Sequence, residues 1–393
     1  MLVFTHKERK VLDGNSPLIT RLLTRLRERY VLGMYWGWYS PNTLPPAYID
    51  FHLGHESSVT FSGDARVRRL PYHSSSFTPA AFRPRTEVPK QWDVMSVTRP
   101  LRAKHTGELL EALRLFLTAR PNARALVLCL APKELSNRDE RDLAEQYERL
   151  FDAELRTRLS FVYMQGGPLR PFNRGDIAFL YAASRSFALF SSREGASRSI
   201  KEALACGLPV LVRKELEGGG LDFLSSANSR VFSDPKDAAE KLAELLDDPN
   251  VRHAAIAKEF EHLSEVHGIP RLQKDLDLVL QELGEVPGGE YRLHDLSIRL
   301  PSHDSREVPL ELQHGLTADL MRPEDMARYL KFLVLDRPWA EIDLTPDELR
   351  DLDPPPTPKK RVQRAPASSS EKQSAPPAAK GTFFTRLSRF LAR

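Results

Sequence analysis

Short apolar runs alternate with amphipathic stretches along the middle of the chain. A run rich in β-branched residues at 94–97 is followed by a stretch in which Leu109, Leu113 and Leu117 recur at helical spacing. Four more apolar runs continue the alternation: 125–130, 159–163, 187–190 and 209–212. This βαβα pattern predicts a parallel sheet with helices on both faces, an arrangement that binds ligands beyond the carboxyl ends of its strands.

The two ends of the chain follow the pattern less clearly. Residues 2–4 predict a first strand and 17–30 a basic amphipathic helix, whereas the aromatic and proline-rich stretch 35–46 has no clear period. Beyond the alternating region two further helices are expected, one of them over 323–335. Residues 353–380 are rich in Pro, Ser, Ala and Lys and have almost no large apolar side chains, which predicts disorder.

The positive charge of the chain lies in its last segment. The net charge is +4, but residues 353–393 hold nine Lys or Arg against two carboxylates. That surplus of seven leaves residues 1–352 with a net charge of −3. A nucleic-acid surface needs a basic face on the folded part, so we expect no nucleic-acid partner.

Cysteines and apolar runs indicate the compartment. Cys129 and Cys206 are the only cysteines of the chain, and each lies within an apolar run, so a disulfide framework or cysteine-rich metal site is excluded. No uncharged apolar run approaches the roughly 20 residues of a membrane-spanning helix, and residues 5–8 (Thr-His-Lys-Glu) interrupt any secretion signal. We therefore expect a cytoplasmic protein with two reduced cysteines in its core.

A turn of small residues joins the apolar run 187–190 to a helix. Gly195 permits a tight turn, Ser197 can cap the helix, and Gly207 suits the left-handed residue that commonly ends one. Backbone N–H groups at such a helix start favour negative charge and sugar hydroxyls. An ordinary strand–helix connection of any α/β protein has the same features, so the turn alone leaves both interpretations open.

Two glutamates make this turn more specific. Seven residues lie between Glu194 and Glu202, and the run Ala-Leu-Ala-Cys-Gly-Leu-Pro-Val-Leu-Val follows at 203–212. If a helix covered those seven residues, the two glutamates would lie roughly 12 Å apart. The run resembles the paired-glutamate signature of retaining GT-B glycosyltransferases of family 4, the glycosyl transferases group 1.

This resemblance assigns a role to each residue of the turn. It implies that Glu194 contacts the hydroxyls of the donor sugar as the catalytic residue, and that Glu202 accepts hydrogen bonds from the nucleotide ribose. The other residues that it places at the donor are Gly195, Ala196 and Ser197. The alternative is that both glutamates are surface carboxylates of a helix.

A second match follows the first apolar run. Arg99 and Lys104, five positions apart, resemble the family's diphosphate loop, in which an Arg and a Lys bind the phosphates of the donor. Fixed cations stabilise the charge of a departing diphosphate without a metal. The family usually has Gly where this chain has Thr98, and two solvated charges are the alternative. Weaker similarities at 70–84 and 166–183 agree in order with these motifs.

The resemblance implies an α/β, GT-B-like fold with two Rossmann-like domains, of which the N-terminal one is reduced. Four segments are expected in chain order: a shortened acceptor-side domain at 1–85, a nucleotide-sugar domain at 86–285, a helical extension at 286–352, and a disordered basic tail at 353–393. Residues 1–85 are about half as long as the usual N-terminal domain of the family, and they lack its glycine-rich first loop.

The implied activity is transfer of a sugar from a nucleotide diphosphate-sugar to an acceptor hydroxyl, with retention of configuration (EC 2.4, hexosyltransferase type). The same resemblance implies a role in glycan or polysaccharide synthesis and a glycan or lipid-linked acceptor. It also implies that the reaction needs no cofactor and no metal. Because the N-terminal half is reduced, a second hypothesis stays open. In it the chain is a catalytically degenerate donor-binding scaffold or a subunit of a glycosylation complex.

A histidine near the donor sugar often occurs in the family, and His52 and His55 are the candidates here. His52 and His55 lie in one short segment with Glu56, and His73 lies in the segment between the domains. A lone histidine is more often structural. Two histidines and one carboxylate at this spacing also resemble a metal site, but the pattern is common by chance, and we expect no metal.

The end of the tail has an amphipathic pattern. Residues 381–393 place five large apolar side chains on one helical stripe, with three arginines on the remaining surface. Such a short basic helix is typical of weak binding to an anionic membrane, which would place the protein on the inner face of the membrane. A partner-docking or frayed end fits the same pattern.

Overall fold

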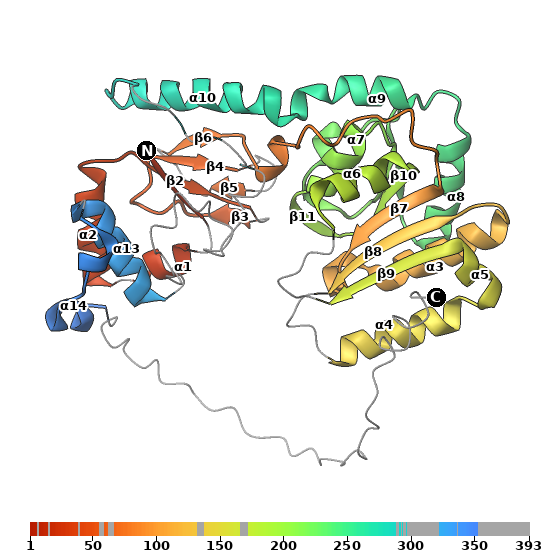
Figure 1. Ribbon diagram of the computed structural model, residues 1–393, viewed down its shortest axis with the longest axis horizontal. Coiled ribbons are helices and arrows are strands. Elements are labelled where there is room, and N and C mark those ends of the chain that lie inside the picture. Colours follow the sequence, from red (N-terminus) through yellow and green to blue (C-terminus); the bar gives the residue numbers. More distant parts are fainter. Residues whose placement is uncertain are drawn as a thin grey trace, which may run out of the picture.

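The structure, a computed structural model, describes residues 1–5, 8–14, 16–37, 40–54, 59–61, 67–131, 137–165, 172–287, 291, 293, 296, 322–335 and 337–352. These residues form two α/β domains, each built on a parallel sheet (Figure 1). The expected two-domain architecture with a smaller N-terminal domain is therefore confirmed. The expected disordered tail and its terminal helix lie outside the described residues.

The larger domain is built on six parallel strands in the order β14-β12-β10-β7-β8-β9. In chain order these are β7 (Trp92–Thr98), β8 (Ala125–Ala131), β9 (Leu159–Gln165), β10 (Ser184–Leu189), β12 (Val210–Arg213) and β14 (Ser229–Phe232). Each predicted apolar run is one of these strands. The strand order reverses between β7 and β10, so the loops after these two strands flank the crevice where doubly wound sheets bind ligands.

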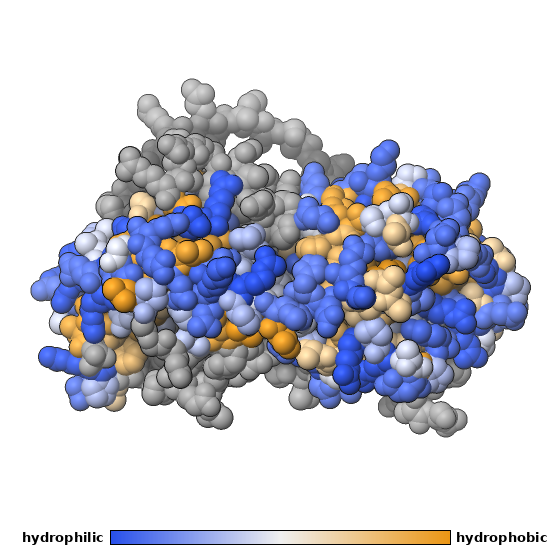
Figure 2. All heavy atoms as spheres, turned by 90° about the horizontal axis from the view of Figure 1, so that it is seen from above, coloured by the Kyte–Doolittle hydropathy of each residue, from blue (hydrophilic) through white to orange (hydrophobic). Residues whose placement is uncertain are grey.

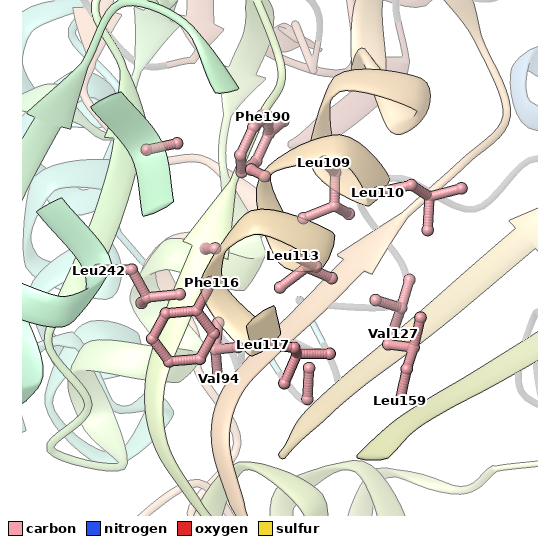
Figure 3. Close-up of a cluster of buried hydrophobic side chains, with 14 of the residues drawn as sticks. Val94, Leu109, Leu110, Leu113, Phe116, Leu117, Val127, Leu159, Phe190 and Leu242 are labelled. Carbon is pink, nitrogen blue, oxygen red and sulfur yellow. The ribbon is translucent and has the colours of Figure 1, made fainter. Parts of the chain in front are cut away.

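Helices cover both faces of this sheet. One face packs against α3 (Thr106–Ala119), α4 (Asn137–Leu150), α5 (Ala153–Arg158) and α8 (Pro235–Asp247). The other face packs against α6 (Arg174–Ala182), α7 (Arg198–Ala205) and α9 (His253–Glu259). Figure 3 shows Leu113 and Phe116 of α3 among the side chains of the first face, where both are almost fully buried. Each such side chain stabilises the fold by roughly 1.5–3 kcal/mol.

The N-terminal domain is built on four parallel strands in chain order: β1 (Leu2–Thr5), β2 (Leu32–Tyr35), β4 (Phe51–Leu53) and β6 (Arg68–Leu70). Helices α1 (Arg9–Leu12) and α2 (Pro17–Arg27) connect the first two strands. The described parts of the later connections hold no helix. They contain β3 (Ser40–Thr43) and β5 (Val59–Phe61), which pair with each other. These short connections account for the small size of this domain.

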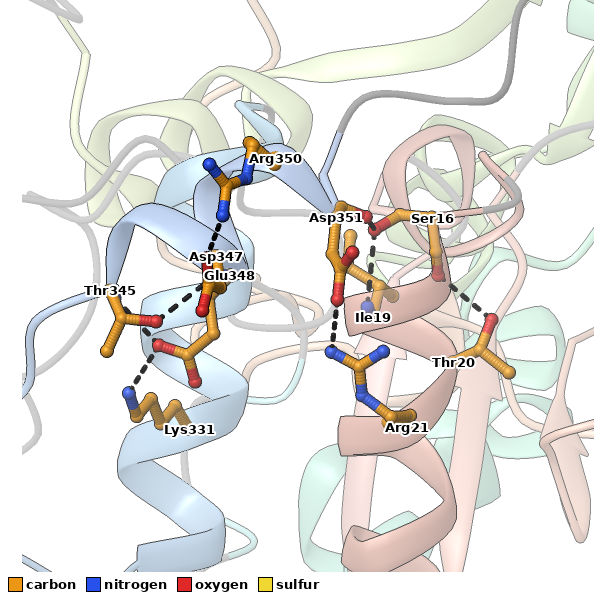
Figure 4. A network of polar contacts seen from close by, with 10 residues as sticks. All are labelled: Ser16, Ile19, Thr20, Arg21, Lys331, Thr345, Asp347, Glu348, Arg350 and Asp351. Carbon is orange, nitrogen blue, oxygen red and sulfur yellow. Dashed lines mark hydrogen bonds and ion pairs between the residues drawn. The ribbon is translucent and has the colours of Figure 1, made fainter.

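The C-terminal helices complete the N-terminal domain. Ser16 caps α2, and the apolar stripe of this helix packs against α13 (Pro323–Leu335). Next to α14 (Pro346–Arg350), Asp351 accepts a hydrogen bond from Ser16 Oγ at 3.0 Å and pairs with Arg21 at 2.6 Å (Figure 4). The described part of the expected extension 286–352 is helical, but it belongs to the N-terminal core, because the apolar face of α2 needs a covering helix.

A long helix, α10 (Glu265–Glu282), returns from the larger domain to the smaller one (Figure 1). Leu272, Leu276 and Val279 pack into the core of the N-terminal domain. The expected boundary at 285 is therefore corrected, since this helix covers the second face of the N-terminal sheet. Figure 2 views the molecule from this side, where mostly hydrophilic side chains surround small apolar groups.

The chain crosses between the domains twice, and the two crossings are paired. Thr78 N–H donates to Leu263 O at 3.1 Å, and Glu265 N–H donates to Thr78 O at 2.9 Å. Gly268 of α10 lies against the crossing, where a Cβ atom would stand 2.6 Å from Ser76 O. The two domains are thus joined by one hydrogen-bonded pair of segments.

Candidate functional site

The paired glutamates lie on two different elements. Glu194 belongs to a short strand, β11 (Arg193–Ala196), which pairs in parallel with β13 (Glu217–Gly219). Glu202 belongs to α7, which begins only at Arg198. The expectation of a helix over the intervening residues is therefore wrong, and the separation of roughly 12 Å inferred from it does not apply.

Glu194 forms a direct ion pair with Lys104. Lys104 Nζ donates to Glu194 Oε1 at 2.5 Å, and the two side chains are 22% and 18% exposed. The partners are separated by 90 positions in the chain. Two separate motifs of the sequence assigned Lys104 and Glu194 to the same donor, and the structure places these two side chains in contact.

Arg99 lies on the same turn but is solvent-exposed, and no ion pair to its guanidinium is found among the described residues. Its backbone is held in place, because Thr106 Oγ1 donates to Arg99 O at 2.7 Å. Thr98, which stands where the family has Gly, is buried, and its hydroxyl lies 3.1 Å from Thr106 Oγ1. Thr98 thus fits into the turn and strengthens it.

Glu202 is mostly buried, with 14% of its side chain exposed. Burial raises its pKa from 4.5 to about 7, although Arg198, whose Nε lies 3.7 Å from Glu202 Oε1, and a hydrogen bond with Tyr181 oppose the shift. A buried carboxylate with few partners suits a ligand that donates hydrogen bonds, such as a ribose diol.

The three small residues of the turn shape the backbone beside both glutamates. Gly195 and Ala196 are buried in β11, and Ser197 caps α7 by accepting a hydrogen bond from Ile200 N–H at 3.4 Å. The Ser197 N–H donates to Gly219 O at 3.1 Å. This N–H group is therefore bonded to β13 and is not one of the helix-start N–H groups that could bind a negative charge.

The histidines have other surroundings. His52 is 1% exposed, and burial together with the nearby charge of Arg69 lowers its pKa to about 4. His73 caps a 3₁₀ turn, η1 (Ser74–Ser76), by accepting from Ser75 N–H at 3.1 Å. Both side chains are buried within the fold. His55 and Glu56 lie outside the described residues.

The site faces the N-terminal domain. Tyr35, at the end of β2, donates to Ser74 Oγ of η1 at 3.1 Å, and burial raises the pKa of Tyr35 to about 12. The positive charge of Arg198 acts on Tyr35 across the domain boundary. The start of α7 therefore lies next to the carboxyl end of the N-terminal strand β2.

Sequence reasoning missed two residues beside Glu202. Tyr181 of α6 is fully buried, and the nearby Glu202 carboxylate contributes to a pKa well above 10. Lys201 is 1% exposed, and its Nζ lies 4.5 Å from the centre of the Phe223 ring. The signal for Lys201 was present in the sequence, since a lysine stands beside Ile200 on an otherwise apolar helix face.

Two further observations concern ligands and membranes. Among the described residues, no group of three or more His, Cys, Asp and Glu side chains is arranged to hold a metal ion. In the same part of the chain, none of the helices is long and apolar enough to cross a membrane.

Residues 169–262 match the family described as Glycosyl transferases group 1. The matched segment contains Glu194 and Glu202 together with the strands and helices that position them. The larger domain thus contains a segment that is similar to the glycosyl transferases group 1. No curated protein matches the sequence significantly.

Solved structures of glycosyltransferases are similar in part. The pneumococcal O-GlcNAc transferase GtfA, in complex with UDP and GlcNAc, has a TM-score of 0.48 and 12% identity over 64% of this chain and 53% of its own. A UDP-forming trehalose-phosphate synthase from Burkholderia xenovorans has a TM-score of 0.48 and 15% identity over 66% and 71%.

The C-terminal domain of LpcC, a glycosyl transferase group 1 family protein from Francisella tularensis, has a TM-score of 0.37 and 22% identity over 48% of this chain and 94% of that domain. This chain spans about half the length of GtfA and of TarM, with 53% and 51% of them covered.

Proposed function

We propose that the protein transfers a sugar from a nucleotide diphosphate-sugar to an acceptor hydroxyl with retention of configuration, as a hexosyltransferase of glycan or polysaccharide synthesis. One observation carries the proposal, namely the contact of Lys104 with Glu194, which lies in the segment that matches the glycosyl transferases group 1. The two side chains are 22% and 18% exposed and meet beyond the carboxyl ends of β7 and β10, where doubly wound sheets bind ligands.

The residues suggest a division of tasks. Arg99 and Lys104 would bind the diphosphate, Glu202 would accept hydrogen bonds from the ribose, and Glu194 would accept them from the sugar. The bond between the anomeric carbon and the phosphate oxygen breaks, and its electron pair leaves with the nucleoside diphosphate. The acceptor oxygen attacks the same face of the sugar, and its proton passes to the departing phosphate.

This mechanism requires no carboxylate nucleophile and no metal. Two positive side chains stabilise the charge that develops on the leaving group. We therefore also propose a reaction without any cofactor. Activity that is unchanged by a chelator supports this, and activity that returns only with a divalent cation contradicts it.

The test is binding and hydrolysis of a panel of UDP-, GDP- and ADP-sugars by wild type, Glu202→Ala and Arg99→Ala. Binding that both substitutions abolish, with slow donor hydrolysis, supports a working transferase site and identifies the base. The configuration of the released sugar, followed by NMR, then tests retention.

The second candidate function is a donor-binding scaffold or subunit of a glycosylation complex. The small N-terminal domain favours it, because its sheet has four strands and the described parts of its later connections hold no helix. Donor binding without hydrolysis or transfer to any acceptor supports the scaffold. Activity that appears only with a partner chain supports the subunit.

We further propose a cytoplasmic protein that binds weakly to the inner face of the membrane through residues 381–393, where a lipid-linked acceptor would be found. The arginines of this segment carry the proposal. Deletion of 353–393 should abolish binding to anionic vesicles and leave nucleotide binding intact. Unchanged vesicle binding would remove the idea.

A further inference from the structure

The turn that carries Lys104 and the strand that carries Glu194 are joined through their backbones. Ser192 N–H, two residues before Glu194, donates to Ala103 O at 2.9 Å. Ser192 O in turn accepts from Glu217 N–H at 2.9 Å, at the start of β13. The two segments are therefore held in register without the ion pair, so the ion pair forms between partners that are already aligned.

The backbone after Lys104 is unusual. His105 has a φ of 47° and is, within the described residues, the only residue other than glycine with a positive φ. A bulky residue adopts this region only where its surroundings fix it. Here Glu108 Oε1 lies 2.7 Å from His105 Nδ1, and Arg213 pairs with the same carboxylate. The direction of the Lys104 side chain is thus set by its neighbours.

The Lys104 ammonium has unused capacity. It carries three N–H donors, and among the described residues Glu194 is its only ion-pair partner. Its side chain is 22% exposed, so a ligand can reach the other two donors. Arg99, on the same turn, has no contact with Glu194 that would link the two.

We propose that Lys104 is a positioning residue as well as a phosphate ligand: its ammonium holds Glu194 in place for the donor sugar and binds a diphosphate oxygen at the same time. The inference rests on the proposed function and adds a coupling to it. One ammonium group thus takes part in the recognition of both the sugar and the diphosphate.

Electrostatics predicts how substitutions of Lys104 and Glu194 combine in their effect on diphosphate affinity. Without Lys104, the Glu194 carboxylate would face the negative diphosphate with no cation between them. Loss of Lys104 should then lower the affinity for the diphosphate twice over, through the lost contact and through repulsion by Glu194. The neutral substitution Glu194→Gln removes the repulsion and should restore part of the affinity. Arg99 is not paired with Glu194, so its loss should not be restored in this way.

The experiment is a pair of double-mutant cycles on the full chain, with calorimetric titration of UDP, GDP and ADP. One cycle combines Lys104→Met with Glu194→Gln, and the matched control combines Arg99→Met with Glu194→Gln. We expect Lys104→Met to lower the affinity for the tightest-binding nucleoside diphosphate about 30-fold. Glu194→Gln should raise this affinity again by about tenfold in the Lys104→Met variant, but not in the Arg99→Met variant. Lys104→Gln replaces Lys104→Met if thermal unfolding shows that the latter does not fold.

A second measurement compares each nucleoside diphosphate with its sugar conjugate. Lys104→Met should remove the preference for the conjugate, whereas Arg99→Met should lower both affinities and keep the preference. Additive effects in both cycles would overturn the coupling and leave the proposed function standing, because the diphosphate still binds. If wild type binds no nucleoside diphosphate, both the coupling and the proposed function are wrong.

Discussion

Replacing Glu202 with Gln should stabilise the protein, although Glu202 belongs to the proposed donor site. The carboxylate is 14% exposed, and burial raises its pKa from 4.5 to about 7. The folded protein therefore holds a charged group that would be better solvated in the unfolded chain. Gln keeps the shape and the hydrogen bond to Tyr181 without this cost.

The magnitude follows from the shift. The folded carboxyl binds its proton more tightly than the unfolded one, so the penalty is absent below pH 4.5, grows between pH 4.5 and 7, and is complete above pH 7. At about 1.4 kcal/mol per unit of pKa, the full penalty is about 3 kcal/mol. For a domain of this size it corresponds to roughly 6–12 °C in melting temperature.

Calorimetric melting of wild type and Glu202→Gln between pH 4.5 and 8.5 measures the effect. The variant should melt higher at pH 8 and together with wild type near pH 4.5. Glu217→Gln is the control, since the side chain of Glu217 is 53% exposed and its replacement should change little at any pH. A difference that does not vary with pH, or a variant that melts lower at pH 8, would refute the reasoning.

Three further predictions concern the same region and the domain junction. Nucleotide affinity, measured by titration, should fall about tenfold per pH unit below 7 as Glu202 becomes protonated, and Glu202→Gln should be weak at every pH. Burial lowers the pKa of Lys201 to about 7, so its charged form destabilises the fold fully below pH 7 and less and less up to pH 10.5. Lys201→Met should therefore raise the melting temperature most below pH 7 and least near pH 10.5. A gain in melting temperature that grows with pH contradicts this. Gly268→Ala should lower the melting temperature by several degrees, since a Cβ there would stand 2.6 Å from Ser76 O, whereas Gly284→Ser, with no atom within 4 Å of its Cβ, tests the cost of a positive φ alone.

The larger domain was predictable because its strands are buried on both faces. Such strands appear as continuous apolar runs, and five of the six strands were recognised from this property, whereas β14 (Ser229–Phe232) was not. The strand β11 was missed because Arg193, Glu194 and Gly195 have no apolar period. It exists only through its pairing with β13, more than twenty positions away.

The N-terminal domain was harder to predict because its core is completed from the far end of the chain. The helix over 323–335 was predicted, but not the element that it packs against. In the structure this helix, α13, meets α2, which lies about 300 positions earlier. Local sequence carries no information on such a contact.

The candidate site was predictable residue by residue but not as a geometry. Motif spacing indicated Lys104 and Glu194 separately, and only the fold brings their side chains to 2.5 Å. Tyr181 was missed because an aromatic residue on a helix is usually core, and its contact with Glu202 depends on how α6 and α7 pack.

The paired crossing at Thr78 and Ser264 has a consequence for synthesis of the chain. The larger domain is inserted between the strands of the smaller one and the helices α10 and α13 that cover them. At translation rates of about 5–20 residues per second, the first strands wait roughly 15–55 s for α13. During that time their apolar faces are open to chaperones or to aggregation, so the domain that begins the chain is the last to finish folding.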